Sequence, residues 1–136
     1  MSDIYREIIL DYYRHPRNQG KIENPDIVAR DSNPLCGDDI EIQIKLSKDK
    51  KSIEDIKFNG KGCAISQASV SMLTEMVQGL SLEEVKGISK EDIFEALGNP
   101  DLGPTRVKCA LLGLKVLKLG VYNYLGSKLD SEREGL

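Results

Sequence analysis

Two hydrophobic periods alternate along the chain, and their order predicts one helix, then strands, then several helices. Apolar residues recur at helical spacing over 2–14, where Ser2 can cap the start and Pro16 follows the end. Over 40–46 apolar and polar residues alternate strictly, as in a strand with one buried face. The alternation resumes at 56–58, and Asn59-Gly60 has the composition of a hairpin turn, so a short third strand is expected at 61–64. The segment 17–35 shows little periodicity and is expected to be a turn-rich connection.

The second half of the chain is predicted to be helical. Helical spacing returns over 65–80, Ser81 opens a capping-box pattern with Glu84, and further helices are expected at 89–97 and 105–125. The last of these is apolar around most of its circumference, so it lies centrally or is partly covered by a partner such as a second copy. The polar residues 126–136 are expected to fray. The predicted fold class is α+β: a single domain over 1–136 with an N-terminal helix, a three-stranded antiparallel sheet, and helices packed on one face of the sheet.

Composition narrows the class of function. The chain has 136 residues, with 40% hydrophobic and 30% charged residues, as in an ordinary globular domain. Its net charge of −3 argues against nucleic acid or anionic lipid as the main partner, and it has no Trp for base stacking. The first residues lack the pattern of a signal peptide, and no apolar run is long enough for a membrane span. A cytoplasmic location is therefore expected.

The candidate chemistry lies in the cysteines, Cys36, Cys63 and Cys109. Their odd number and the lack of a Cys-x-x-Cys pair argue against a disulfide framework, a zinc ribbon or a thioredoxin-type pair. Spacing alone favours the common role of a thiol as a small buried hydrophobe. However, all three lie at the ends of predicted elements, where a helix N-terminus or a neighbouring Lys makes a thiol easier to ionise. The predicted strands can also bring Cys36 and Cys63 to one edge of the sheet.

Three blocks around these cysteines resemble a known family. The blocks are Asn33-Pro34-Leu35-Cys36-Gly37-Asp38, Gly60-Lys61-Gly62-Cys63-Ala64-Ile65-Ser66-Gln67-Ala68-Ser69 and Arg106-Val107-Lys108-Cys109. Together with the start of the chain, they are similar to the IscU/NifU/SufU-type iron–sulfur cluster assembly scaffolds. The resemblance covers residues 4 to 125 and rests on three motifs in the right order.

The resemblance implies a non-enzymatic scaffold on which a [2Fe–2S] cluster is built from iron and persulfide sulfur and then transferred to apoproteins. It implies a cysteine desulfurase as sulfur donor, and recipient apoproteins or cluster carriers as partners. The ligands it implies are Cys36, Asp38, Cys63 and Cys109, with Cys109 and Cys36 as candidate sulfur acceptors. Thiolates suit iron–sulfur clusters, and the harder oxygen of Asp38 exchanges more readily, which suits a site that transfers its cluster.

The chain also departs from the IscU and SufU branches of this family. Lys108 stands where the IscU branch has a His before the third Cys, and an ammonium is a poor iron ligand. Lys108 could instead pair with Asp38 or hold sulfide and persulfide anions near Cys109. The stretch 102–108 lacks the Leu-Pro-Pro-Val-Lys chaperone segment of that branch. A Lys here is typical of the SufU branch, yet the insertion which that branch carries between the second and third Cys is absent.

Zinc-based alternatives therefore stay open. One is a zinc-bound, SufU-like sulfur acceptor that relays persulfide without building a cluster. Another is a structural zinc site on an interaction module, because tetrahedral zinc accepts the same four ligands. His15, the only histidine, is expected at the surface at a helix end, and strand alternation predicts Asp38 and Asp39 on opposite faces.

Overall fold

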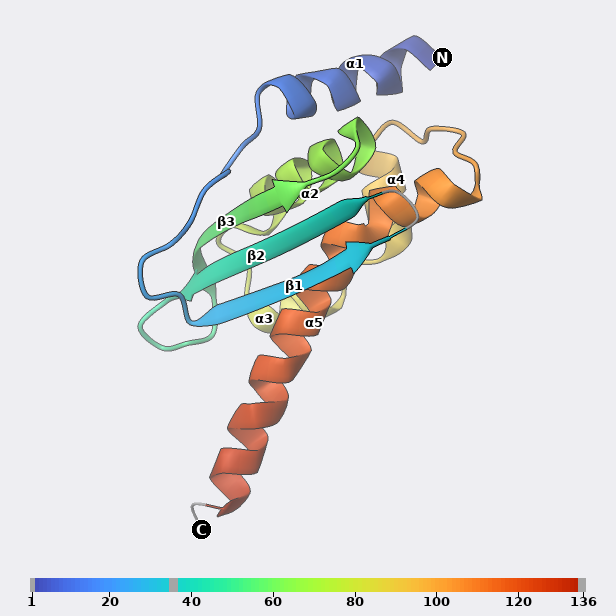
Figure 1. The fold of residues 1–136 in the computed structure, drawn as a ribbon. Coiled ribbons are helices and arrows are strands. Elements are labelled where there is room, and N and C mark those ends of the chain that lie inside the picture. The colour runs from blue at the N-terminus through green and yellow to red at the C-terminus, as the bar shows by residue number, and fades with distance from the viewer. Residues whose placement is uncertain (1, 35–36, 135–136) are drawn as a thin grey trace.

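The computed structural model describes residues 2–34 and 37–134, with side chains described over 6–34 and 37–126. One helix precedes the sheet and four follow it (Figure 1). The elements are α1 (Ser2–Arg14), β1 (Ile27–Asn33), β2 (Asp38–Leu46), β3 (Ile53–Lys61), α2 (Ala64–Val77), α3 (Leu82–Lys86), α4 (Lys90–Ala96) and α5 (Pro104–Glu134). Ser81 and Ser89 form the capping boxes that open α3 and α4, the first of them as the sequence predicts.

The sheet has three antiparallel strands in the order β1-β2-β3, which confirms the predicted sheet type. Three details of the predicted strands are wrong. The first strand, β1, lies within the segment expected to be a connection, and no strand covers 61–64. Asn59 and Gly60 are not a turn but lie in β3, opposite Glu41 and Ile40. Gly60 is needed because its φ is +128° and a Cβ there would collide with the carbonyl oxygen of Asp39.

Strand β2 supplies the centre of the core. Ile40, Ile42, Ile44 and Leu46 point to one face and are at most 2% exposed. Burying each of them contributes about 1.5–3 kcal/mol. Helices α2 and α5 pack on this face, and α1 lies against α2, so the helices share one side of the sheet as predicted (Figure 1). A register shift between Lys45 and Leu46 explains why the apolar Ile53 falls out of phase in the sequence.

Helix α5 runs to Glu134, nine residues past the predicted helix end at 125, so that predicted end is wrong. One Gly at 126 does not stop a helix when good helix formers follow it. The part of α5 up to Gly120 lies directly on the sheet, and a Cβ at Gly120 would come within 3.0 Å of Ala29. The second half of α5 projects beyond the sheet (Figure 1). None of the described helices combines the length and apolarity required to cross a bilayer.

Candidate metal centre

Three elements bring metal-binding side chains to one point. Asp38 begins β2, Cys63 directly precedes α2, and Cys109 lies in the second turn of α5. One ligand atom from each lies within 4.8 Å of the other two. Metal–ligand bonds to S and O are about 2.0–2.3 Å long, so these atoms can share one ion after small side-chain movements. Asp38 and Cys109 are buried at 1% and 2% exposure, whereas Cys63 is half-buried.

One carboxylate oxygen of Asp38 accepts hydrogen bonds, whereas the other has no donor among the described residues. Its Oδ1 accepts hydrogen bonds from the backbone N–H of Cys63 at 2.9 Å and from the Ser66 hydroxyl at 3.1 Å. Its Oδ2 is buried and has no hydrogen-bond donor among the described residues. A buried oxygen without a partner is unfavourable by about 1–3 kcal/mol. A cation bound between this oxygen and the two thiols removes that penalty, so the donor set fits a metal.

A glycine and a serine make this orientation possible. A Cβ at Gly62 would collide with the Ser66 hydroxyl and come within 2.5 Å of Asp38 Oδ1. Ser66 is fully buried and its hydroxyl also lies 3.0 Å from the carbonyl oxygen of Cys63. Neither Gly62 nor Ser66 is predicted from the sequence to support the site. The available signal is that Ser66 is the third residue of a helix whose cap is Cys63, the position that faces the capping side chain.

Cys63 is the N-cap of α2, a helix of 14 residues. Its Sγ accepts a hydrogen bond from the backbone N–H of Ser66 at 3.5 Å. The partial positive charge of a helix N-terminus favours an anion at this position. The Cys63 sulfur therefore lies where a helix N-terminus directs a backbone N–H toward it, and the thiolate is in general the form of cysteine that binds metals and attacks sulfur.

Both thiols open onto one pocket of about 360 Å³ between the starts of α2 and α5. Thr105 and Arg106 also line this pocket and are exposed, so the pocket connects the thiols with the surface. Arg106 adds a positive charge to the exposed side of this pocket, which favours an anionic ligand there.

The other residues singled out from the sequence fall in three places. Cys36 lies outside the described residues. Lys108 is exposed and makes no ion pair with Asp38, whose hydrogen bonds within the described chain come from Cys63 and Ser66. His15 is exposed just after α1 and is not part of the group.

Asp39 confirms the expected alternation. It points away from the thiols and accepts hydrogen bonds from the Arg30 guanidinium at 2.6 and 2.8 Å. These bonds hold the pKa of Asp39 below its ordinary value, as expected for a surface ion pair. Two neighbouring aspartates thus have different surroundings, and one of them faces the thiols.

Comparison with known proteins agrees with this geometry. The profile of the NifU-like N-terminal domain matches residues 4–131. A curated relative from Aquifex aeolicus, the iron–sulfur cluster assembly scaffold protein IscU, is 39% identical over 125 residues, which cover 92% of this chain and 78% of the relative. The zinc-dependent sulfurtransferase SufU of Bacillus subtilis is also 39% identical, over an alignment of 137 positions. This alignment covers 89% of this chain and 91% of SufU.

Solved structures show the same fold. The SufU protein of Fervidobacterium islandicum AW-1 matches with a TM-score of 0.75 and 32% identity, covering 88% of this chain and 97% of that structure. An N-terminal NifU-like protein from Brucella abortus matches with a TM-score of 0.73 and 20% identity, covering 92% and 96% of the two chains.

Proposed function

Since this chain belongs to the NifU-like N-terminal domain family, we propose that it is a scaffold on which a [2Fe–2S] cluster is assembled and then passed to recipient apoproteins. The iron–sulfur scaffold proteins among its relatives, at 37–39% identity, support this role. The observation that carries the proposal is the convergence of Asp38, Cys63 and Cys109, with one buried carboxylate oxygen left without a donor.

In this proposal Cys63, Cys109 and Asp38 hold the cluster, which is cargo and not a resident cofactor. Cys36 is the fourth ligand, because it precedes Asp38 by two residues in the chain. A [2Fe–2S] cluster needs four protein ligands, and thiolates are its usual ones. The single oxygen ligand from Asp38 is the weak point through which the cluster leaves, because carboxylates bind iron less firmly than thiolates in such clusters.

A cysteine desulfurase is the proposed source of persulfide sulfur. Cys109 and Cys36 are the candidate acceptors, and the hydrogen bond to Cys63 Sγ adds Cys63 to them. Lys108, next to Cys109, supplies a positive charge for anionic sulfur without acting as a ligand. The protein acts as a carrier and not as an enzyme, and a reducing compartment such as the cytoplasm suits a site that works through free thiols.

A zinc-bound sulfur relay is the alternative, and the SufU relative together with Lys108 favours it. Zinc is well matched to a Cys and Asp donor set. Against it, the alignment with SufU spans 137 residues yet covers only 89% of this 136-residue chain, so SufU carries residues that this chain lacks. The alignment with the Aquifex IscU spans 125 residues and 92% of the chain, which leaves no such excess.

Anaerobic reconstitution with iron, cysteine and a desulfurase distinguishes the two. We expect about two iron and two sulfide per cluster, with visible charge-transfer bands. Cys63→Ser and Cys109→Ser abolish these bands, whereas Asp39→Asn, on the opposite face of the sheet, keeps them. One zinc per chain that iron does not replace, with sulfur uptake intact, establishes the relay instead. A chain that holds neither metal contradicts both.

A further inference from the structure

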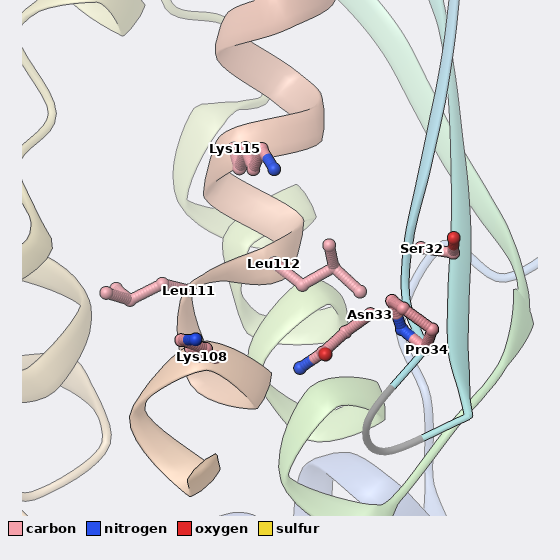
Figure 2. A pocket seen from close by; sticks show the side chains of 7 residues that line it. All are labelled: Ser32, Asn33, Pro34, Lys108, Leu111, Leu112 and Lys115. Carbon is pink, nitrogen blue, oxygen red and sulfur yellow. The ribbon is translucent and has the colours of Figure 1, made fainter. Parts of the chain in front are cut away.

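A second cavity lies beside the candidate metal centre, between the end of β1 and one face of α5 (Figure 2). It has a volume of about 460 Å³. Its lining residues from β1 and the residue after it are Ser32, Asn33 and Pro34, and those from α5 are Lys108, Leu111, Leu112 and Lys115. The four α5 residues follow one another at helical spacing, so they form one continuous wall. We refer to this cavity as the lysine groove.

The lysine groove combines two positive charges with an apolar floor. The Lys115 ammonium lies 3.0 Å from Asp31, and its side chain is 69% exposed, so it can contact a further anion. Lys108 is exposed and has no ion pair among the described residues. Leu112 is buried, and Leu111 and Pro34 extend the apolar surface. Small-molecule sites are cavities of about 300–1,000 Å³ with an apolar lining and a few polar anchors, and this cavity has that composition.

The lysine groove lies close in the fold to the elements that carry Asp38 and Cys109. Lys108 directly precedes Cys109 in the chain, and Asn33 is the register partner of Asp38 across β1 and β2. The groove therefore borders the two elements that carry Asp38 and Cys109, whereas Cys63 and Cys109 themselves line the neighbouring pocket at the starts of α2 and α5. Two ammonium groups beside an apolar floor favour a small anionic molecule, and carboxylates are among the anions that such groups bind.

We propose that the lysine groove binds a small thiol that carries carboxylates, and that this thiol reduces the cysteine-bound persulfide to sulfide. The proposal rests on the proposed function, because cluster assembly needs sulfide whereas a desulfurase supplies sulfur at the persulfide level. The net reaction is Cys–S–SH + 2 R–SH → Cys–SH + R–S–S–R + H₂S. The sulfane sulfur gains two electrons, and two thiols lose them as they form a disulfide.

The step proceeds by thiolate attack in two stages. A bound R–S⁻ attacks the outer persulfide sulfur, the S–S bond to the cysteine breaks, and Cys–S⁻ leaves as a product. A second R–S⁻ attacks the R-bearing sulfur of R–S–S⁻ and releases sulfide, which takes up protons from solvent. The lysines accelerate the first stage by holding the carboxylates, which raises the local concentration of the thiol at the cysteines.

The test compares a charged and a neutral thiol on the same protein. The metal-free full chain is loaded with persulfide by a cysteine desulfurase, and the added mass of one sulfur atom verifies loading. Failure at this point counts against the proposed function and not against the groove. Sulfide release is then measured with glutathione, which carries two carboxylates, and with mercaptoethanol, which carries none.

We expect the rate to saturate with glutathione concentration and to rise linearly with mercaptoethanol. The glutathione-to-mercaptoethanol rate ratio falls about two- to fivefold in each of Lys108→Gln and Lys115→Gln, as for the loss of one exposed ion pair. Lys115→Arg restores the ratio because it keeps the charge. Lys118→Gln, a lysine of the same helix outside the groove, keeps the ratio of the unmodified chain.

A second readout does not depend on sulfur transfer. S-methylglutathione lacks a free thiol but keeps both carboxylates, so it binds the metal-free chain and shifts the NMR signals of Asn33 and Leu112. The proposal is overturned if these signals do not move at millimolar concentrations. It is also overturned if the rate ratio is the same in the lysine variants and the unmodified chain, in which case the groove serves no charged thiol.

Discussion

Two aspartates contact the two ends of β2, and each accepts a hydrogen bond from a backbone N–H of another segment. Asp26 lies beside the last residue of β2, and Asp38 is its first residue. Asp26, just before β1, accepts the backbone N–H of Leu46 through Oδ2 at 2.7 Å, and its Oδ1 lies 3.2 Å from the Lys50 ammonium. Asp38 also accepts a backbone N–H, from Cys63, but only its Oδ1 is bonded. Both carboxylates fasten a neighbouring segment to the sheet. Of these two aspartates, only Asp38 has a carboxylate oxygen without a donor among the described residues, and it lies beside two thiols.

One of these carboxylates serves only the stability of the fold, whereas the other also serves the chemistry of the site. At the Asp26 end the carboxylate pairs with both Lys45 and Lys50, so this contact is complete without any ligand. At the Asp38 end the chain leaves a buried oxygen that is unfavourable until a cation arrives. Metal binding therefore stabilises the second end and leaves the first unchanged. Each substitution below changes one side of this contrast.

Gly62→Ala has the largest expected effect, because the new Cβ overlaps the Ser66 hydroxyl and Asp38 Oδ1. The free energy of unfolding falls by about 1–3 kcal/mol, as for an overpacked site. Metal affinity falls by about 100-fold or more, since one ligand is displaced along with its support. Zinc competition titrations and thermal unfolding measure the two effects. Gly87→Ala is the control, because its nearest contact is an ordinary 3.5 Å. Normal zinc affinity in Gly62→Ala contradicts the assigned geometry.

Asp38→Ala comes next and changes the lifetime of the cluster. If the carboxylate is the exchangeable ligand, the reconstituted cluster decays about tenfold more slowly without it, which equals about 1.4 kcal/mol in the barrier. The decay of the visible absorbance under an iron chelator gives the lifetime. Asp26→Ala is matched in chemistry and leaves the lifetime as it is. A lifetime in Asp38→Ala that is equal or shorter removes the role given to the oxygen ligand.

Ser66→Ala tests the orientation of Asp38 by a smaller step. It removes one of the two hydrogen bonds to Oδ1 and leaves the bond from Cys63. Loss of such a supporting contact lowers metal affinity about tenfold. The charge-transfer bands also shift, which a purely structural role does not produce. Ser69→Ala is the matched control, because this buried serine of the same helix bonds to the Ala110 carbonyl instead. Equal effects of the two changes on metal affinity contradict a positioning role for Ser66.

The sequence predicts the fold class because strict alternation in β2 and helical spacing in α2 and α5 are strong local patterns. Strand β1 is not predicted from the sequence because only one of its buried side chains is large and apolar. Its buried positions are Ile27, Ala29 and Asn33. Its place is decided by α5, which approaches closely at Gly120. Local sequence cannot show such a contact between segments far apart in the chain.

The candidate site divides in the same way. Asp38, Cys63 and Cys109 are predicted as donors through the resemblance of their motifs to the scaffold family, since spacing alone favours buried thiols, and alternation places Asp38 and Asp39 on opposite faces. The supporting residues are not predictable, because Ser66 and Gly62 act through atoms 28 and 24 positions away from the carboxylate that they orient. Their role depends on how α2 meets the start of β2.

Asp26→Asn has the smallest expected effect, and it changes the carboxylate whose two oxygens both have partners. The N–H of Leu46, followed by the ammonium of Lys50, holds the pKa of Asp26 below its ordinary value. A depressed carboxylate pKa stabilises the fold at pH above the unfolded value of about 3.9, and this contribution disappears as the pH falls through the folded pKa. Asp26→Asn therefore lowers the free energy of unfolding by about 1 kcal/mol at neutral pH, and the difference closes below about pH 4. Urea unfolding across this range measures it. A difference that persists in acid means that the amide lost packing and not charge, and a change in metal affinity means that the two ends of β2 are coupled.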